Sequence, residues 1–183
     1  MTVEEIFNQI ASHMIEGISY HEEMAQAYNF IGLWGFAKCQ VSHCCEEHNN
    51  LFCLRQYYAT HYFKLLQEEH THHPEIIPST WYKYTAHAVD TSTKKQAVKE
   101  LMNKWVEWER STKTFYQAMR QELMSISEHA AANYLDNFII DVTKELSHAE
   151  KKLIKLDTIN YDLIVVIEMS EEMDKKYTKK LGW

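Results

Sequence analysis

Glycine and proline are scarce in this sequence. The 183 residues include four glycines and two prolines, and a β-sandwich or β-barrel needs such turn formers between its many short strands. The composition therefore argues against an all-β fold. A chain of this length forms one hydrophobic core, and we expect a single all-α domain that spans residues 1–183.

Clustered positive charge and long apolar runs are also lacking. The net charge of −7 disfavours a phosphate-backbone partner, which requires grouped lysines and arginines. The longest apolar run, at residues 163–167, is far shorter than the ~20 residues of a membrane span, and the first residues are acidic where a signal peptide is basic. We expect a cytoplasmic protein with no nucleic-acid and no membrane partner.

The cysteines form no CxxC pair. Cys39, Cys44, Cys45 and Cys53 therefore give no indication of a disulfide framework or of a zinc site. The sequence also has no phosphate-binding loop, no nucleophile elbow and no HExxH motif, so it gives no support for the enzyme classes that use them.

What the sequence does contain is helical periodicity. Apolar residues recur at helical spacing and predict helices at residues 2–31, 36–68, 92–124, 127–156 and 160–180. Thr2 and Glu5 form a capping box for the first helix. Asp90 or Thr91 can cap the third helix, and Asn160 can cap the last.

The connections between these helices predict two helical hairpins. Gly32 and Gly35 mark a short turn after the first helix, and Ser127 lies in a second break. About twenty residues, roughly 70–91, separate the hairpins, and at ~3.3 Å per residue they can run the length of a bundle. We expect a four-helix bundle of two hairpins joined by a long crossover, with an extra C-terminal helix at about 160–180.

Potential metal ligands interrupt the inward-facing stripes at a common depth. His21 and Glu46 are each about twelve residues from the first turn. Glu109 and Glu145 are each about seventeen to eighteen residues from the second turn, and His148 shares a helix face with Glu145. Carboxylates are costly in a core unless they are paired, protonated or bound to a cation. This pattern predicts a mid-bundle metal site.

Two segments resemble the ferritin superfamily. Residues 36–47 read FAKCQVSHCCEE, which is similar to the second-helix pattern of ferritin heavy chains, and residues 145–153 read ELSHAEKKL, which is similar to the ExxHAEKL run of ferritin-type helices. The resemblance implies a ferritin-like four-helix bundle that binds iron or manganese. It also implies metal handling, or oxygen or peroxide chemistry, as the function.

The resemblance also implies one or more ligands from each helix. They are Glu16 or His21 in the first helix, Glu47 in the second, Glu109 or Glu107 in the third, and Glu145 with His148 in the fourth. The depth argument adds Glu46, and His43 lies one turn before Glu47.

A second interpretation is a metal-free, non-enzymatic adaptor that has the same bundle. The ferritin pattern has histidine three residues after Glu47, where this chain has Asn50. The histidines on the stripes can instead be neutral core residues, and the carboxylates can form buried hydrogen bonds or salt bridges. The aromatic content of 13%, with Tyr82, Tyr84 and Trp183, suits a homo-oligomer or a protein partner. No small-molecule substrate is indicated.

Overall fold

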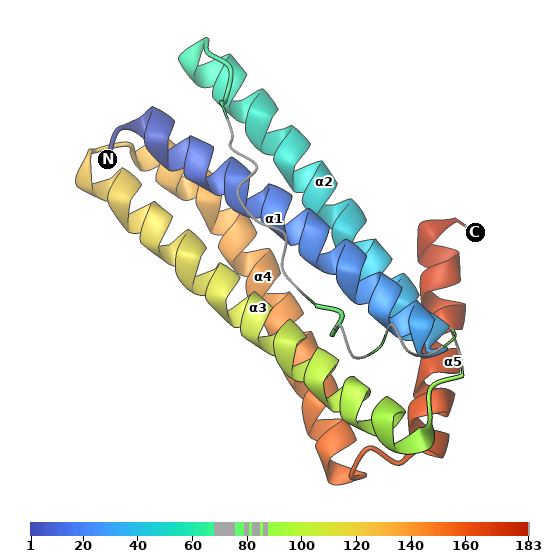
Figure 1. The fold of residues 1–183 in the computed structure, drawn as a ribbon. Helices are drawn as coiled ribbons and strands as arrows, with labels where there is room; N and C mark the ends of the chain where they lie inside the picture. Colours follow the sequence, from blue (N-terminus) through green and yellow to red (C-terminus); the bar gives the residue numbers. More distant parts are fainter. Residues whose placement is uncertain (68–75, 79–80, 82–84, 86–87, 183) are drawn as a thin grey trace.

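Five α-helices make up the protein in a computed structural model that describes residues 1–67, 76–78, 81, 85 and 88–182 (Figure 1). They are α1 (Val3–Phe30), α2 (Trp34–Tyr62), α3 (Thr91–Ser125), α4 (His129–Thr158) and α5 (Leu163–Leu181). No strand occurs in the described part of the chain. The predicted all-α class is confirmed.

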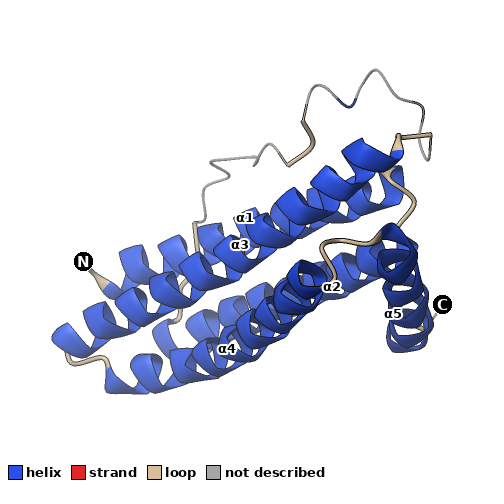
Figure 2. Cartoon of the chain, turned by 90° about the horizontal axis from the view of Figure 1, so that it is seen from below, coloured by secondary structure: helices blue, strands red, loops and turns tan. Residues whose placement is uncertain are grey.

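The four long helices form a bundle of two hairpins. α1 packs along α2 and α3 packs along α4, while α5 packs mainly on α2. Figure 2 shows α5 at one end of the bundle, at a steep angle to the other helices, and the N-terminus at the opposite end. The end of α2 and the start of α3 also lie at opposite ends of the bundle (Figure 1), as two hairpins joined by a long crossover require. Most of the predicted crossover, about 70–91, lies outside the described residues.

Two predicted helix caps are present. The Glu5 amide donates to the Thr2 side chain at 3.2 Å, and the Thr2 amide donates to the Glu5 carboxylate at 2.7 Å, which completes the capping box. At the start of α3, the Asp90 carboxylate accepts a hydrogen bond from the Thr93 amide at 2.9 Å. These caps satisfy amides that have no partner inside the helix.

Two predicted helix boundaries were wrong. Asp162 rather than Asn160 caps α5, because Asn160 lies in the preceding turn with a φ of 48°. α2 ends before Phe63 instead of near residue 68, because Phe63 adopts a left-handed conformation with a φ of 55°. Beyond it, the Lys64 ammonium donates to the Glu4 carboxylate of α1 at 2.7 Å.

Gly35 lies inside α2, where it allows α5 to approach. A Cβ atom on Gly35 would be 1.7 Å from the carbonyl oxygen of Ser170 and 2.6 Å from the amide nitrogen of Asp174. The Gly35 amide instead donates to the Ser170 hydroxyl at 3.0 Å. Gly32 has the expected turn role, with a φ of 79°. The absence of a side chain at Gly35 therefore determines where α5 can dock.

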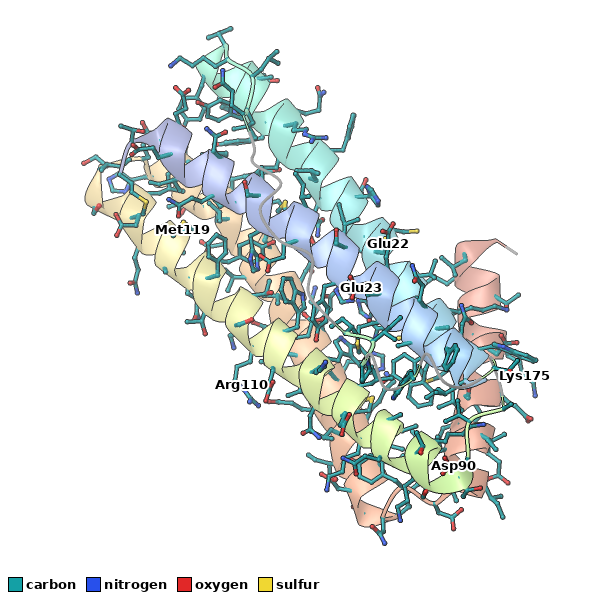
Figure 3. The ribbon with its side chains drawn as sticks, viewed as in Figure 1. Glu22, Glu23, Asp90, Arg110, Met119 and Lys175 are labelled. Carbon is teal, nitrogen blue, oxygen red and sulfur yellow. The ribbon has the colours of Figure 1, made fainter. Side chains whose placement is uncertain are left out.

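The core consists of two apolar clusters, one toward each end of the bundle. The cluster near α5 contains Tyr28, Phe36 and Met102, and the other contains Ile10 and Leu54. Figure 3 shows side chains filling the space between the helices, while those of Arg110 and Lys175 point outward. In the described residues, we find no helix with the length and apolar character of a membrane span.

Candidate metal centre

A layer of polar side chains lies between the two apolar clusters. We call it the mid-bundle layer, and its members are His21, Gln40, His43, Glu46, Glu47, Glu109 and Glu145. On α2, Gln40, His43 and Glu47 are spaced by three and four residues, so they share one helix face. The structure therefore brings the ionisable side chains of four helices to one depth.

One part of this layer is closed and hydrogen-bonded. We call it the closed side; it consists of His21, Gln40 and Glu109, together with Trp105 of the adjoining apolar cluster. The His21 Nδ1 atom lies 2.8 Å from the Gln40 side-chain oxygen, and the Trp105 indole donates to the Glu109 carboxylate at 2.8 Å. The His21 Nε2 atom lies 3.9 Å from Glu109. Because the Gln40 oxygen can only accept, Nδ1 carries the proton and the Nε2 lone pair faces Glu109.

Burial determines the ionisation of the closed side. His21 is 1% exposed and Glu109 is 2% exposed. Desolvation, reinforced by the nearby His43, lowers the pKa of His21 to about 4. Desolvation, reinforced by Glu145, raises the pKa of Glu109 to about 8. Both side chains are therefore neutral at pH 7 in the metal-free protein.

The other part of the layer, which we call the open side, consists of His43, Glu46 and Glu145. The His43 Nδ1 atom lies 3.4 Å from the Glu145 carboxylate and 3.7 Å from the Glu46 carboxylate. One donor atom from each residue falls within 4.8 Å of the other two. Neither ring nitrogen of His43 makes a hydrogen bond of normal geometry with the described residues. This is a compact N, O, O donor set.

Charge is present on the open side. Desolvation acts to lower the pKa of His43, but contacts with Cys39 and Glu145 outweigh it and the pKa is raised well above its usual value. The Lys180 ammonium of α5 contacts the Glu46 carboxylate, and the pKa of Glu46 is lowered, because Lys180 and His43 outweigh its desolvation.

A surface pocket of about 560 Å³ leads to the open side. It lies between α2, α4 and α5, and its lining includes Glu46, Asn50, Glu145 and Lys180. Asn50, which stands where the ferritin pattern has histidine, is thus part of the pocket wall. Small ions can reach the Glu46 and Glu145 carboxylates from solvent by this route.

Glu47 extends toward the backbone of α1. A Cβ atom on Gly17 would be 3.7 Å from the Glu47 carboxyl carbon and 3.3 Å from the Trp108 ring. The Oε2 atom of Glu47 is buried without a hydrogen-bond partner among the described residues. Desolvation, reinforced by Glu145 and Glu109, raises the pKa of Glu47 to about 8. A buried carboxyl oxygen without a partner is costly, and a bound cation would remove that cost.

His148 is not brought into the donor group. Its Nε2 atom lies 2.6 Å from the Lys152 ammonium, which donates to the lone pair that a metal would need. Desolvation, reinforced by Lys152, lowers the pKa of His148 to about 4. The Lys152 ammonium also lies 5.3 Å from the centre of the Trp105 ring.

The two alternative glutamates lie outside the layer. The Glu16 side chain is 35% exposed and lies 4.0 Å from the His13 ring, at a pocket between α1 and α3. Glu107 is exposed on α3 and lines a shallow surface pocket with Arg110. Tyr82, Tyr84 and Trp183, considered as partner-binding residues, lie outside the described residues.

Three side chains at this centre were not among the predicted ligands. Gln40 lies three residues before His43, so its helical spacing could have revealed it. Lys152 lies four residues after His148, and helical spacing places it on the same inward stripe. Lys180 could not be placed in this way, because it belongs to α5, whose docking position depends on a contact at Gly35.

The fold is that of the ferritins. The open-pore ferritin of the archaeon Archaeoglobus fulgidus superposes with a TM-score of 0.76 and 16% identity, over 93% of this chain and 94% of that chain. An engineered closed form of the same ferritin gives 0.77 and 15%, over 95% and 96%. A variant of PmFTN soaked in iron gives 0.72 and 9%, over 91% and 95%. The predicted ferritin-like bundle with an extra C-terminal helix is confirmed.

Sequence comparison gives no such match. No protein-family model matches the chain, and no curated protein matches it significantly. The likeness to ferritins is therefore one of fold, and the chemistry must be argued from the side chains of this chain.

Proposed function

We propose that this chain is a divergent ferritin-like protein that binds iron or manganese in the mid-bundle layer and takes part in metal handling. The observation that supports the proposal best is the open side, where His43, Glu46 and Glu145 present donor atoms within 4.8 Å of one another. His43 has no hydrogen bond of normal geometry among the described residues. Because contacts with Cys39 and Glu145 raise the pKa of His43, metal binding would release a proton from its ring to solvent and so free a ring nitrogen for the ion.

The composition of the layer favours a cation. The nearby positive groups are His43 and Lys180, while Glu46, Glu47 and Glu145 contribute acidic groups. A divalent ion would allow Glu47 to ionise and would compensate the carboxylates that repel one another there. Mixed imidazole and carboxylate donors suit iron and manganese better than soft metals. The iron-soaked structural neighbour favours iron.

Individual residues have separate roles in this proposal. His43 and Glu145 would hold the ion, with Glu46 at its solvent side. Gln40 would orient His21 so that the Nε2 lone pair points inward. Bound iron would supply the capacity to react with oxygen or peroxide. That step is tested by comparing the rate of Fe(II) oxidation in air between wild type and Glu145→Gln.

Metal content tests the binding itself. Purified protein, loaded anaerobically with Fe(II) or Mn(II) and desalted, should retain a near-stoichiometric amount by elemental mass spectrometry, and its melting temperature should rise. The double variant His43→Ala/Glu145→Gln should lose most of this metal. The matched control is Glu150→Gln on the same helix, because Glu150 pairs with Arg110 at the surface at 2.9 Å. A metal-free wild type, or equal loss in the control, would refute the proposal.

One observation favours the adaptor interpretation as a second candidate. Lys180 contacts Glu46 and Lys152 contacts His148, so ammonium groups already occupy positions near two of the expected ligands. In a metal-free adaptor these lysines would be the permanent partners. Wild-type protein that takes up neither metal and gains no thermal stability from either would support this candidate.

A further inference from the structure

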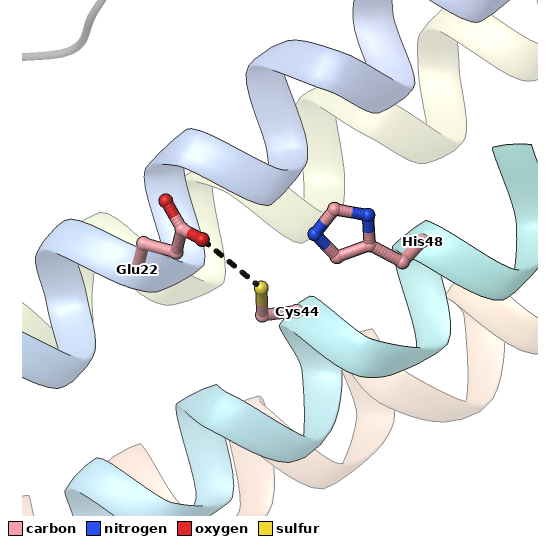
Figure 4. Close-up of side chains that lie close together, drawn as sticks. All are labelled: Glu22, Cys44 and His48. Atoms are coloured by element: carbon pink, nitrogen blue, oxygen red, sulfur yellow. Dashed lines mark hydrogen bonds between the residues drawn. The ribbon is translucent and has the colours of Figure 1, made fainter.

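A second group of metal-binding side chains lies between α1 and α2, away from the mid-bundle layer. We call it the α1–α2 triad; it consists of Glu22 on α1 and Cys44 and His48 on α2 (Figure 4). The Cys44 sulfur lies 3.9 Å from the Glu22 carboxylate. One donor atom from each of the three residues lies within 4.8 Å of the others. Cys44 is buried, while Glu22 and His48 are exposed.

We propose that the α1–α2 triad binds a single zinc ion. A donor set of one thiolate, one imidazole and one carboxylate is typical of zinc. Manganese and non-haem iron are usually bound by oxygen and imidazole donors without a thiolate. Cys44 and His48 are four residues apart and so face the same way on α2. Glu22 supplies the third ligand from the neighbouring helix, and water completes a tetrahedron.

The geometry needs only small side-chain movements. Zinc–ligand bonds of about 2.0–2.3 Å place tetrahedral donor atoms about 3.4–3.6 Å apart. The donors already lie within 4.8 Å of one another, so no pair must close by more than about 1.4 Å. Two of the three side chains are exposed and can rotate. On binding, the Cys44 S–H bond breaks, a Zn–S bond forms and the proton passes to solvent.

The triad is independent of the mid-bundle layer. His43 precedes Cys44 directly, and consecutive residues point about 100° apart on a helix, so His43 faces the bundle interior while Cys44 faces α1. Cys45 is rotated by about another 100° around the helix and lines the pocket between α2, α4 and α5. This arrangement provides a matched control in the adjacent cysteine.

Cobalt substitution tests the site on the full chain. Reduced, chelator-treated protein titrated with Co(II) should develop the thiolate-to-cobalt charge-transfer band and the visible bands of tetrahedral cobalt, and one equivalent of Zn(II) should remove them. Cys44→Ser should abolish the charge-transfer band and weaken zinc binding by at least about 100-fold, since loss of even a supporting residue costs 10- to 100-fold. The double variant Glu22→Gln/His48→Ala should also lose the charge-transfer band and bind zinc at least about 100-fold more weakly. Cys45→Ser should keep the signal.

Further variants separate this site from the mid-bundle centre and from misfolding. His43→Ala/Glu145→Gln should leave the cobalt–thiolate band unchanged. The zinc site is therefore tested separately from the proposed iron or manganese site. Metal-free Cys44→Ser should melt as metal-free wild type does. The proposal is overturned if wild type gives no charge-transfer band, if Cys45→Ser loses it as fully as Cys44→Ser, or if the mid-bundle double variant removes it.

Discussion

The two sides of the mid-bundle layer accommodate buried ionisable groups in different ways. On the closed side, His21 and Glu109 are neutral at pH 7 and are bonded to Gln40 and Trp105. On the open side, the pKa of His43 is raised by Cys39 and Glu145, its Nδ1 atom lies 3.4 Å and 3.7 Å from two carboxylates, and a surface pocket reaches those carboxylates. Neutralisation by burial and hydrogen bonding suits a structural role, whereas charge with solvent access suits ion binding. Four changes test this contrast.

The largest effect should come from detaching α5, which supplies Lys180 to the open side. Gly35→Ala would place a methyl group against the backbone of α5 at Ser170, and backbone cannot rotate away as a side chain can. We expect a loss of about 3 kcal/mol or more in the free energy of unfolding, measured by chemical denaturation. Gly17→Ala is the control, because its methyl group would meet the Trp108 side chain at 3.3 Å. Its effect should stay within about 1 kcal/mol.

The second effect concerns pH. The pKa values of Glu47 and Glu109 are raised from 4.5 to about 8, so the folded state binds more protons than the unfolded state between these values. Their stabilising contribution is complete below pH 4.5 and is lost as the pH rises to about 8. Metal-free protein should lose about 3 kcal/mol of unfolding free energy between pH 6.5 and 8.

A double variant isolates that pH effect. Glu47→Gln/Glu109→Gln should remove most of the decline, because an amide does not ionise. The two proteins are compared above about pH 7.5, where the buried His21, whose pKa is lowered from 6.5 to about 4, no longer changes the slope. An unchanged slope in the double variant would mean that these two carboxyl groups are not protonated in the folded protein.

The third change is directed at a hydrogen bond of the closed side. Trp105→Phe removes the indole donor that bonds Glu109 at 2.8 Å and leaves a buried acceptor without its partner. We expect a loss of about 1–2 kcal/mol of stability, with iron or manganese retained. Loss of metal in this variant would show that the two sides do not act separately.

The smallest effect on stability should come from Lys180→Met. The Lys180–Glu46 ion pair is half exposed, with side-chain exposures of 49% and 38%, so stability should change by no more than about 0.5 kcal/mol. Iron or manganese affinity should increase several-fold, because Glu46 is released to the ion. Lys179→Met, an exposed neighbour, should leave affinity unchanged in equilibrium titrations.

Local sequence was most informative where the interaction is local. Helix caps and helix faces depend on residues three or four positions apart, so Thr2 could be assigned as a cap, the cap of α3 could be narrowed to Asp90 or Thr91, and Glu145 could be placed facing the interior. The cap of α5 was misassigned to Asn160 because Asp162 two residues later competes for the same role. The adjacent residues His43, Cys44 and Cys45 face different neighbours around α2: His43 faces Glu145, Cys44 faces Glu22, and Cys45 lines the surface pocket.

The sequence alone determined that this chain forms a helical bundle of two hairpins, because helical periodicity and the scarcity of turn formers are properties of local segments. It also determined that acidic side chains lie inward at one depth. Tertiary structure decided which residues meet: Lys180 reaches Glu46 only because α5 docks at Gly35, and Glu22 meets Cys44 only because α1 packs along α2. Such contacts depend on how separate helices are positioned relative to one another, and no short stretch of sequence encodes the distance between two helices.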